Sequence, residues 1–140
     1  MTPFHLAFRV DDIESTRAFY AQLLGCPTGR EAPNWIDFDF FGHQISAHIG
    51  ARPETELTTL VGGKTVPLVH FGAVLGWYEW HALADRLQER SANFILAPQH
   101  RFVGAAGEQA TFFVRDPSGN ALEFKAFRHP GAMFETGNAA

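Results

Sequence analysis

Four residues with metal-ligand chemistry lie in short apolar runs that are typical of strands. These residues are His5 in FHLAFRV, His48 in ISAHI, His70 in VPLVHFGAVL and Glu123 in ALEFKAF. Imidazole and carboxylate groups bind divalent iron, manganese, nickel, cobalt and zinc. A carboxylate buried without a partner is costly or becomes neutral, so a cation beside Glu123 would explain its place in an apolar strand. The four residues therefore predict a metal site.

The alternation of side chains along a strand predicts that these candidates face one cleft. Ala7 shares the face of His5, whereas Leu6 and Phe8 take the opposite, more apolar face. The neighbours of Glu123 in sequence are also Leu and Phe, which places the carboxylate on the less apolar side of its strand. We expect the large faces to pack under helices and the ligand faces to line a concave, polar cleft.

The elements that must position the candidates occur twice along the chain. A strand at 4–10, a helix at 11–25 and the strand runs NWIDFDFF and ISAHI form the first half. A strand at 66–75, a helix at 77–91 and the runs NFILA, ATFFV and ALEFKAF form the second half. Each half thus reads as a strand, a helix and about three strands, and each places one candidate in its first strand and one in its last.

The helices have recognisable ends and apolar faces. In the first, Asp11 is the predicted N-cap, with Glu14 as its capping-box partner and Gly25 at the exit. Helical spacing predicts buried faces in both helices. These faces consist of Ile13, Tyr20, Leu23 and Leu24 in the first helix, and of Trp77, Trp80, Ala84 and Leu87 in the second.

Composition indicates one globular domain. The chain has 140 residues, of which 46% are hydrophobic and 19% are charged. We expect a single domain over 1–140 in the α+β class, with module one at 4–50, a linker loop at 51–65, module two at 66–127 and a tail at 128–140.

Charge and cysteine content limit the partners and the compartment. The formal net charge of −4 disfavours a nucleic-acid or anionic-membrane partner. Cys26 is the single cysteine, so an intrachain disulfide is impossible. The first residues do not resemble a signal peptide, and no apolar run approaches the roughly 18 residues that span a bilayer. We expect a cytoplasmic protein.

Two sequence motifs carry a resemblance to a known family. The segments HLAFRVDDIESTRAFYAQLLG and FFVRDPSGNALEF resemble the opening and the closing hairpin of the vicinal oxygen chelate superfamily. This superfamily includes glyoxalase I, extradiol ring-cleaving dioxygenases, fosfomycin-resistance enzymes and bleomycin-resistance proteins. The resemblance covers roughly 4–127 and implies two βαβββ modules that form a half-barrel sheet around a metal, often in a homodimer.

The resemblance also implies roles for individual residues. His5, His70 and Glu123 match the family's metal ligands, and one divalent ion per chain is implied, which could be Fe, Mn, Ni, Zn or Co. His48 matches the fourth ligand of glyoxalase I, where a carboxylate is usual. An imidazole that leaves the metal would instead be a catalytic acid or base.

Four further residues are candidates for substrate binding. Arg9 and Lys125 share the ligand face and suit an anionic substrate, although surface roles fit them equally well. Gln44 shares the face of His48 and lines the cleft or takes its place. Arg101 lies in the glycine-rich segment QHRFVGAAGEQ, which is either a mobile lid or a plain connector. The remaining histidines have no such register, and His81 in particular is expected on the surface.

Two classes of function follow. The first is an enzyme that binds adjacent oxygens of a small molecule on the metal, either as a ring-cleaving dioxygenase or as a glyoxalase-like lyase or isomerase. The second is a non-catalytic drug- or toxin-binding resistance protein. A fosfomycin-type transferase is a further alternative.

Overall fold

The structure is a computed structural model and describes residues 1–137. The first half contains β1 (His5–Val10), α1 (Ile13–Arg17), the π-helix η1 (Ala18–Leu23), β2 (Thr28–Ala32), β3 (Trp35–Phe40) and β4 (His43–Ile49). The second half contains β5 (Thr58–Val61), β6 (Lys64–Pro67), β7 (Phe71–Val74), α2 (Trp77–Glu89), β8 (Asn93–Arg101), β9 (Gln109–Arg115), β10 (Ala121–Phe127) and the 3-10 helix η2 (Pro130–Phe134).

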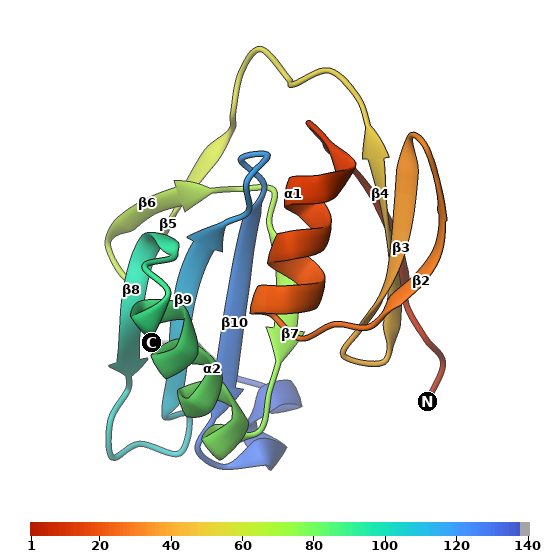
Figure 1. The fold of residues 1–140 in the computed structure, drawn as a ribbon. Coiled ribbons are helices and arrows are strands. Elements are labelled where there is room, and N and C mark those ends of the chain that lie inside the picture. Colours follow the sequence, from red (N-terminus) through yellow and green to blue (C-terminus); the bar gives the residue numbers. More distant parts are fainter. Residues whose placement is uncertain (138–140) are drawn as a thin grey trace.

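Two four-stranded sheets form the frame of the molecule. Their strand orders are β1-β4-β3-β2 and β7-β10-β9-β8, and β5 and β6 pair separately as a hairpin. In each sheet the strand that comes first along the chain pairs in parallel with the strand that comes last along the chain. These pairs are β1 with β4 and β7 with β10. Helices α1 and α2 lie on the same side of the sheets (Figure 1). The predicted α+β class with two βαβββ units is confirmed, and the sheets of the described chain remain open.

The first helix begins one residue later than predicted. Asp12, and not Asp11, is the N-cap: its side chain accepts a hydrogen bond from the Ser15 backbone N–H at 2.8 Å. The capping geometry needs an extended residue directly before the first helical turn, and Asp12 has φ −155° and ψ 161°. The Asp11 carboxylate instead binds Arg9 and Arg52.

The second helix follows its predicted pattern. Trp80, Ala84 and Leu87 are buried as expected, and Leu83 joins them on the same face. The indole N–H of Trp80 donates to the backbone carbonyl of Phe124 at 2.8 Å, so the helix is fixed to β10 by a polar contact as well as by packing.

A continuous aromatic core joins the two halves. The rings of Phe8 on β1 and Phe71 on β7 lie 5.0 Å apart, and Phe40 contacts both Phe71 and Phe124. Phe8 and Phe124 belong to the large faces that the alternation pattern assigned to the helix side of their strands. Their burial between sheets and helices leaves the opposite faces for the predicted ligands.

The turn before β10 anchors this arrangement. The buried carboxylate of Asp116 accepts hydrogen bonds from the backbone N–H groups of Ser118 and Asn120 and from the Tyr20 hydroxyl. Burial, together with the nearby Asp116 carboxylate, raises the pKa of Tyr20 well above its usual value. The Asp-Pro-Ser-Gly-Asn turn is therefore linked to the first half of the chain through the hydrogen bond between Tyr20 and Asp116.

Two predicted segments have a different structure. The 51–65 stretch was expected to be a loop, but its second part forms the β5–β6 hairpin. Gly62 and Gly63 have φ of 55° and 77°, the conformation that two-residue hairpin turns require. The strand predicted at 66–75 is also split, because β6 ends at Pro67 and β7 starts only at Phe71. His70 consequently lies directly before β7 and not within it.

The glycine-rich segment is partly a strand. Strand β8 extends to Arg101, so only the residues after it form the connection to β9. The last three residues of the predicted tail lie outside the described part of the chain, and η2 occupies its first part. Within the described residues, no helix is long and apolar enough to cross a membrane.

Candidate functional site

Glu123 lies on β10, inside the second sheet, with its side chain only 13% exposed. The hydroxyl of Thr111, on the neighbouring strand β9, donates to Oε2 of Glu123 at 2.6 Å. The ammonium of Lys125, two residues along the same face, lies 4.0 Å from that oxygen. One carboxylate oxygen is thus engaged by neighbours, and Oε1 remains to face His70.

His70 presents a defined nitrogen to this carboxylate. Its Nδ1 lies 2.8 Å from the backbone carbonyl of Pro67, which can only accept, so Nδ1 carries the hydrogen in the neutral ring. Its Nε2 therefore has a free lone pair and lies 3.4 Å from Oε1 of Glu123. A proton or a cation between these two acceptor atoms would stabilise their contact. We call these residues the His70–Glu123 pair.

A glycine makes the pair possible. Gly72 on β7 is the register partner of Glu123 on β10. A Cβ at position 72 would collide with the backbone carbonyl of Glu123, so only glycine permits this approach of the two strands. The sequence signal for this residue was a glycine inside an apolar strand, two positions after a candidate ligand.

His5 has a different set of neighbours, on the first sheet. Its Nδ1 lies 2.8 Å from Oε1 of Gln44, its register partner on β4. The amide nitrogen of Gln44 donates to Oδ2 of Asp37 at 3.2 Å, and the Ser46 hydroxyl donates to Oδ1 of Asp37 at 2.5 Å. We call these four residues the His5 cluster. Sequence reasoning included Gln44 but missed Asp37 and Ser46.

The predicted ligands do not all converge within one chain. Across the described residues, no three His, Cys, Asp or Glu side chains lie together as a metal site. His5 belongs to the first sheet, whereas Glu123 belongs to the second and His70 lies directly before its strand β7.

His48 does not join His5. In the parallel β1–β4 register His48 is opposite Arg9, while Gln44 is opposite His5. Four residues along a strand span about 13 Å. The His48 ring instead packs against Trp35, with centroids 6.3 Å apart. Within the single chain His48 therefore lies away from His5, because the register depends on strand pairing and not on alternation alone. Its role as a ligand or as an acid or base stays a prediction.

The residues predicted to bind substrate lie in different parts of the structure. The guanidinium of Arg9 donates to the backbone carbonyl of Gly50 and binds Asp11 within the first half. It also donates to the backbone carbonyl of Ser118, and this contact joins the two halves of the chain. Lys125 lies beside Glu123. Arg101 lies over the ring of Phe102, at 4.8 Å from its centroid, and close to Gly62 in the β5–β6 hairpin.

The structure also contains a histidine pair that the sequence did not indicate. Nε2 of His81 on α2 lies 2.9 Å from Nε2 of His100 on β8. Nδ1 of His81 faces the Trp77 carbonyl at 2.7 Å, so His100 is the donor between the two rings. His81 was expected to be a plain surface residue, and this contact links α2 to β8.

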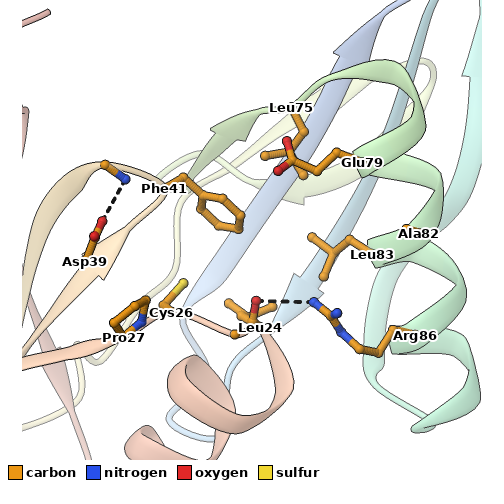
Figure 2. Close-up of a pocket in the computed structure, with 12 residues that line it drawn as sticks. Leu24, Cys26, Pro27, Asp39, Phe41, Leu75, Glu79, Ala82, Leu83 and Arg86 are labelled. Atoms are coloured by element: carbon orange, nitrogen blue, oxygen red, sulfur yellow. Dashed lines mark hydrogen bonds between the residues drawn. The ribbon is translucent and has the colours of Figure 1, made fainter.

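The surface is hollowed beside the His5 cluster and, away from the predicted ligands, beside α2. A cavity of about 350 Å³ adjoins the His5 cluster, and Gln44, Asp37 and Arg30 are among its lining residues. A larger hollow of about 450 Å³ lies between α2 and the turns of the first half (Figure 2). There, Arg86 donates to the carbonyls of Leu23 and Leu24. Burial and the nearby Asp39 raise the pKa of Cys26 to about 12, which leaves a thiol of low reactivity.

The residues of the His70–Glu123 pair fit a divalent metal. Two ligand atoms that each lie about 2.1 Å from one ion are about 3 to 3.4 Å apart at right-angled or tetrahedral geometry. The 3.4 Å between Nε2 of His70 and Oε1 of Glu123 agrees with this spacing. The hydrogen bonds from Thr111 and to Pro67 orient both ligands from behind, as is common around bound metals.

The comparison with protein families identifies the class of protein. The sequence model of the Glyoxalase/Bleomycin resistance protein/Dioxygenase superfamily matches residues 2–124. The chain belongs to this superfamily, and the resemblance inferred from its two motifs is confirmed. No curated protein sequence matches the chain.

Solved structures agree with this assignment. A glyoxalase/bleomycin resistance protein/dioxygenase from Alicyclobacillus acidocaldarius is 32% identical, with a TM-score of 0.79 and coverage of 95% of this chain and 96% of that one. The fosfomycin resistance protein FosX from Listeria monocytogenes is 14% identical, with a TM-score of 0.70 and coverage of 95% and 98%. TioX from Micromonospora sp. ML1 is 17% identical, with a TM-score of 0.65 and coverage of 91% and 99%. The last two likenesses concern the fold alone.

Proposed function

We propose that the protein is a divalent-metal-dependent enzyme that binds a small molecule through two adjacent oxygens. The observation that carries the proposal is the His70–Glu123 pair, in which two metal-ligand atoms face each other 3.4 Å apart without a hydrogen between them in the neutral state. A metal held there would act as a Lewis acid on the substrate oxygens.

The third ligand in this proposal is His5 of a second copy of the chain. His5 has the right chemistry but lies on the other sheet, and the described residues hold no complete three-ligand group. A homodimer that brings the first sheet of one copy against the second sheet of the other would complete two equal sites. The protein would then contain one metal per chain. We also propose, independently of the site, that it is cytoplasmic.

The chain's own residues have distinct tasks in this scheme. Thr111 holds Glu123, and the Pro67 carbonyl holds His70, so both ligands keep their orientation without substrate. Lys125, beside the carboxylate, is placed to attract an anionic substrate group. The cavity of about 350 Å³ next to the His5 cluster supplies room for a small molecule.

Elemental analysis of protein purified without added metal tests the proposal. We expect about one divalent ion per chain, and Glu123→Ala should lose most of it because the anionic ligand is gone. Glu89→Ala, which changes an exposed carboxylate on α2, is the matched control and should keep the metal. Full metal content in Glu123→Ala would overturn the assignment. A screen with catechols and with the methylglyoxal–glutathione hemithioacetal would then separate dioxygenase from lyase or isomerase chemistry.

A second candidate function is binding of a drug or toxin without metal or turnover. It is favoured by one observation: the described part of a single chain lacks a complete ligand group. Protein that is free of metal, dimeric and catalytically inactive in the same preparation would support this reading. The fosfomycin-type transferase alternative has no separate observation in its favour beyond the shared fold.

A further inference from the structure

We infer that Asp37 determines which nitrogen of His5 carries the hydrogen, and that it acts through the amide of Gln44. Asp37 is a positioning residue in this scheme, because it reaches His5 only through Gln44. The inference rests on the proposed role of His5 as a metal ligand, and it extends that role to a residue two strands away.

The amide of Gln44 has two ends with opposite hydrogen-bonding character. Its nitrogen only donates and its oxygen only accepts. The nitrogen lies 3.2 Å from Oδ2 of Asp37, and the oxygen lies 2.8 Å from Nδ1 of His5. A carboxylate repels the amide oxygen, so Asp37 selects the orientation in which that oxygen faces His5.

Asp37 is itself held in place. Its other oxygen, Oδ1, accepts the hydroxyl of Ser46 at 2.5 Å, and Ser46 is only 6% exposed. Ser46 is the register partner of Asp37 across β3 and β4, and Gln44 is the register partner of His5 across β4 and β1. Three adjacent strands thus carry a continuous hydrogen-bonded chain from Asp37 to His5.

The consequence concerns the lone pair of His5. Because Nδ1 faces an acceptor, the hydrogen of the neutral ring is on Nδ1 and Nε2 is free to bind a metal. His70 has the same arrangement by a different route, since a backbone carbonyl fixes its tautomer. The fixed carbonyl of Pro67 cannot rotate, whereas the amide of Gln44 can, so only His5 depends on a carboxylate for its tautomer.

Asp37→Asn should reverse the direction of the hydrogen bonds that run from residue 37 through Gln44 to His5. An asparagine at position 37 can accept from Ser46 through its oxygen and turn its amide nitrogen toward Gln44. The Gln44 oxygen then faces residue 37, and the Gln44 nitrogen donates to Nδ1 of His5. His5 must therefore carry its hydrogen on Nε2, which blocks the atom that would bind the metal.

Nitrogen-detected NMR of the histidine rings in metal-free protein at about pH 8.5, where imidazole is neutral, measures the tautomer directly. Wild type should show His5 with its hydrogen on Nδ1, and Asp37→Asn should shift it to Nε2. The double variant Asp37→Asn with Gln44→Glu should restore Nδ1, because a carboxylate at position 44 can only accept. Zinc affinity should fall about 10- to 100-fold in the single variant and recover in the double variant.

The matched control is Asp39→Asn. Asp39 is the register partner of Gln44, but its carboxylate accepts the backbone N–H of Gly42 and not the amide. It should leave the His5 tautomer unchanged. An Nδ1 hydrogen that persists in Asp37→Asn, or a tautomer that the double variant does not restore, would overturn the inference. If the tautomer shifts as expected while wild type binds no metal, the proposed function fails and the role of Asp37 stands.

Discussion

Nε2 of His70 and Oε1 of Glu123 face each other across 3.4 Å, although they come from positions that are far apart in the sequence. Each atom is the free end of a side chain whose other end is already hydrogen-bonded, His70 to Pro67 and Glu123 to Thr111. This arrangement explains why a strand as apolar as β10 tolerates a carboxylate.

Thr111→Val should lower both metal affinity and stability, because it removes a hydrogen bond that holds Glu123. Valine keeps the shape of threonine but removes the hydroxyl that donates to Glu123 at 2.6 Å. We expect the free energy of unfolding of metal-free protein to fall by about 1.5–3 kcal/mol and metal affinity to fall about 10-fold or more. Urea unfolding and a metal titration measure both. Thr65→Val, at an exposed position on β6, should change neither. Unaltered metal affinity in Thr111→Val would show that the hydroxyl does not support the ligand.

Gly72→Ala should separate β7 from β10. The added Cβ would collide with the backbone carbonyl of Glu123, and backbone cannot move aside as a flexible side chain can. We expect a loss of more than about 2 kcal/mol in the free energy of unfolding, together with weaker metal binding. Gly107→Ala is the control, because a Cβ there meets nothing within 4 Å. Equal stability of the two variants would contradict the close approach of the strands.

His48→Ala and His5→Ala should differ in metal content. Both histidines are exposed and lie on the first sheet, but they are about 13 Å apart along paired strands. We expect His5→Ala to lose metal and His48→Ala to keep it, as measured by elemental analysis after gel filtration. A loss of turnover of 10²-fold or more in metal-replete His48→Ala would indicate an acid or base role after all. Equal metal loss in both variants would place His48 in the ligand set.

Asp11 should contribute a pH-dependent part of the stability. Its hydrogen bonds with Arg52 and Arg9 lower the pKa of its carboxyl from 3.8 to about 2. A pKa that is depressed in the folded state adds stability above the unfolded value, and this stability is lost as the pH falls from about 4 to about 2. The difference in unfolding free energy between wild type and Asp11→Asn, measured by urea unfolding of metal-free protein, should therefore shrink over this range. A difference that stays constant from pH 6 to pH 2.5 would contradict the assignment.

Alternation and helical spacing correctly predicted the strand face of Glu123 and the buried face of α2. Glu123 was assigned to the less apolar face of its strand because its neighbours are leucine and phenylalanine, and the structure buries those neighbours while leaving Glu123 partly exposed. The face of α2 was also predicted from spacing alone. These features depend on residues within a few positions of each other, so local periodicity is sufficient to determine them.

Strand pairing decided what local pattern could not. Whether His5 meets Gln44 or His48 depends on the register between β1 and β4, which every side chain along both strands sets together. The contact between His81 and His100 likewise depends on how α2 packs on β8. Local sequence pattern was sufficient to identify the candidate ligands and the strand faces that carry them. Which of these residues meet depends on the tertiary structure, because register and helix packing are long-range properties of the whole chain.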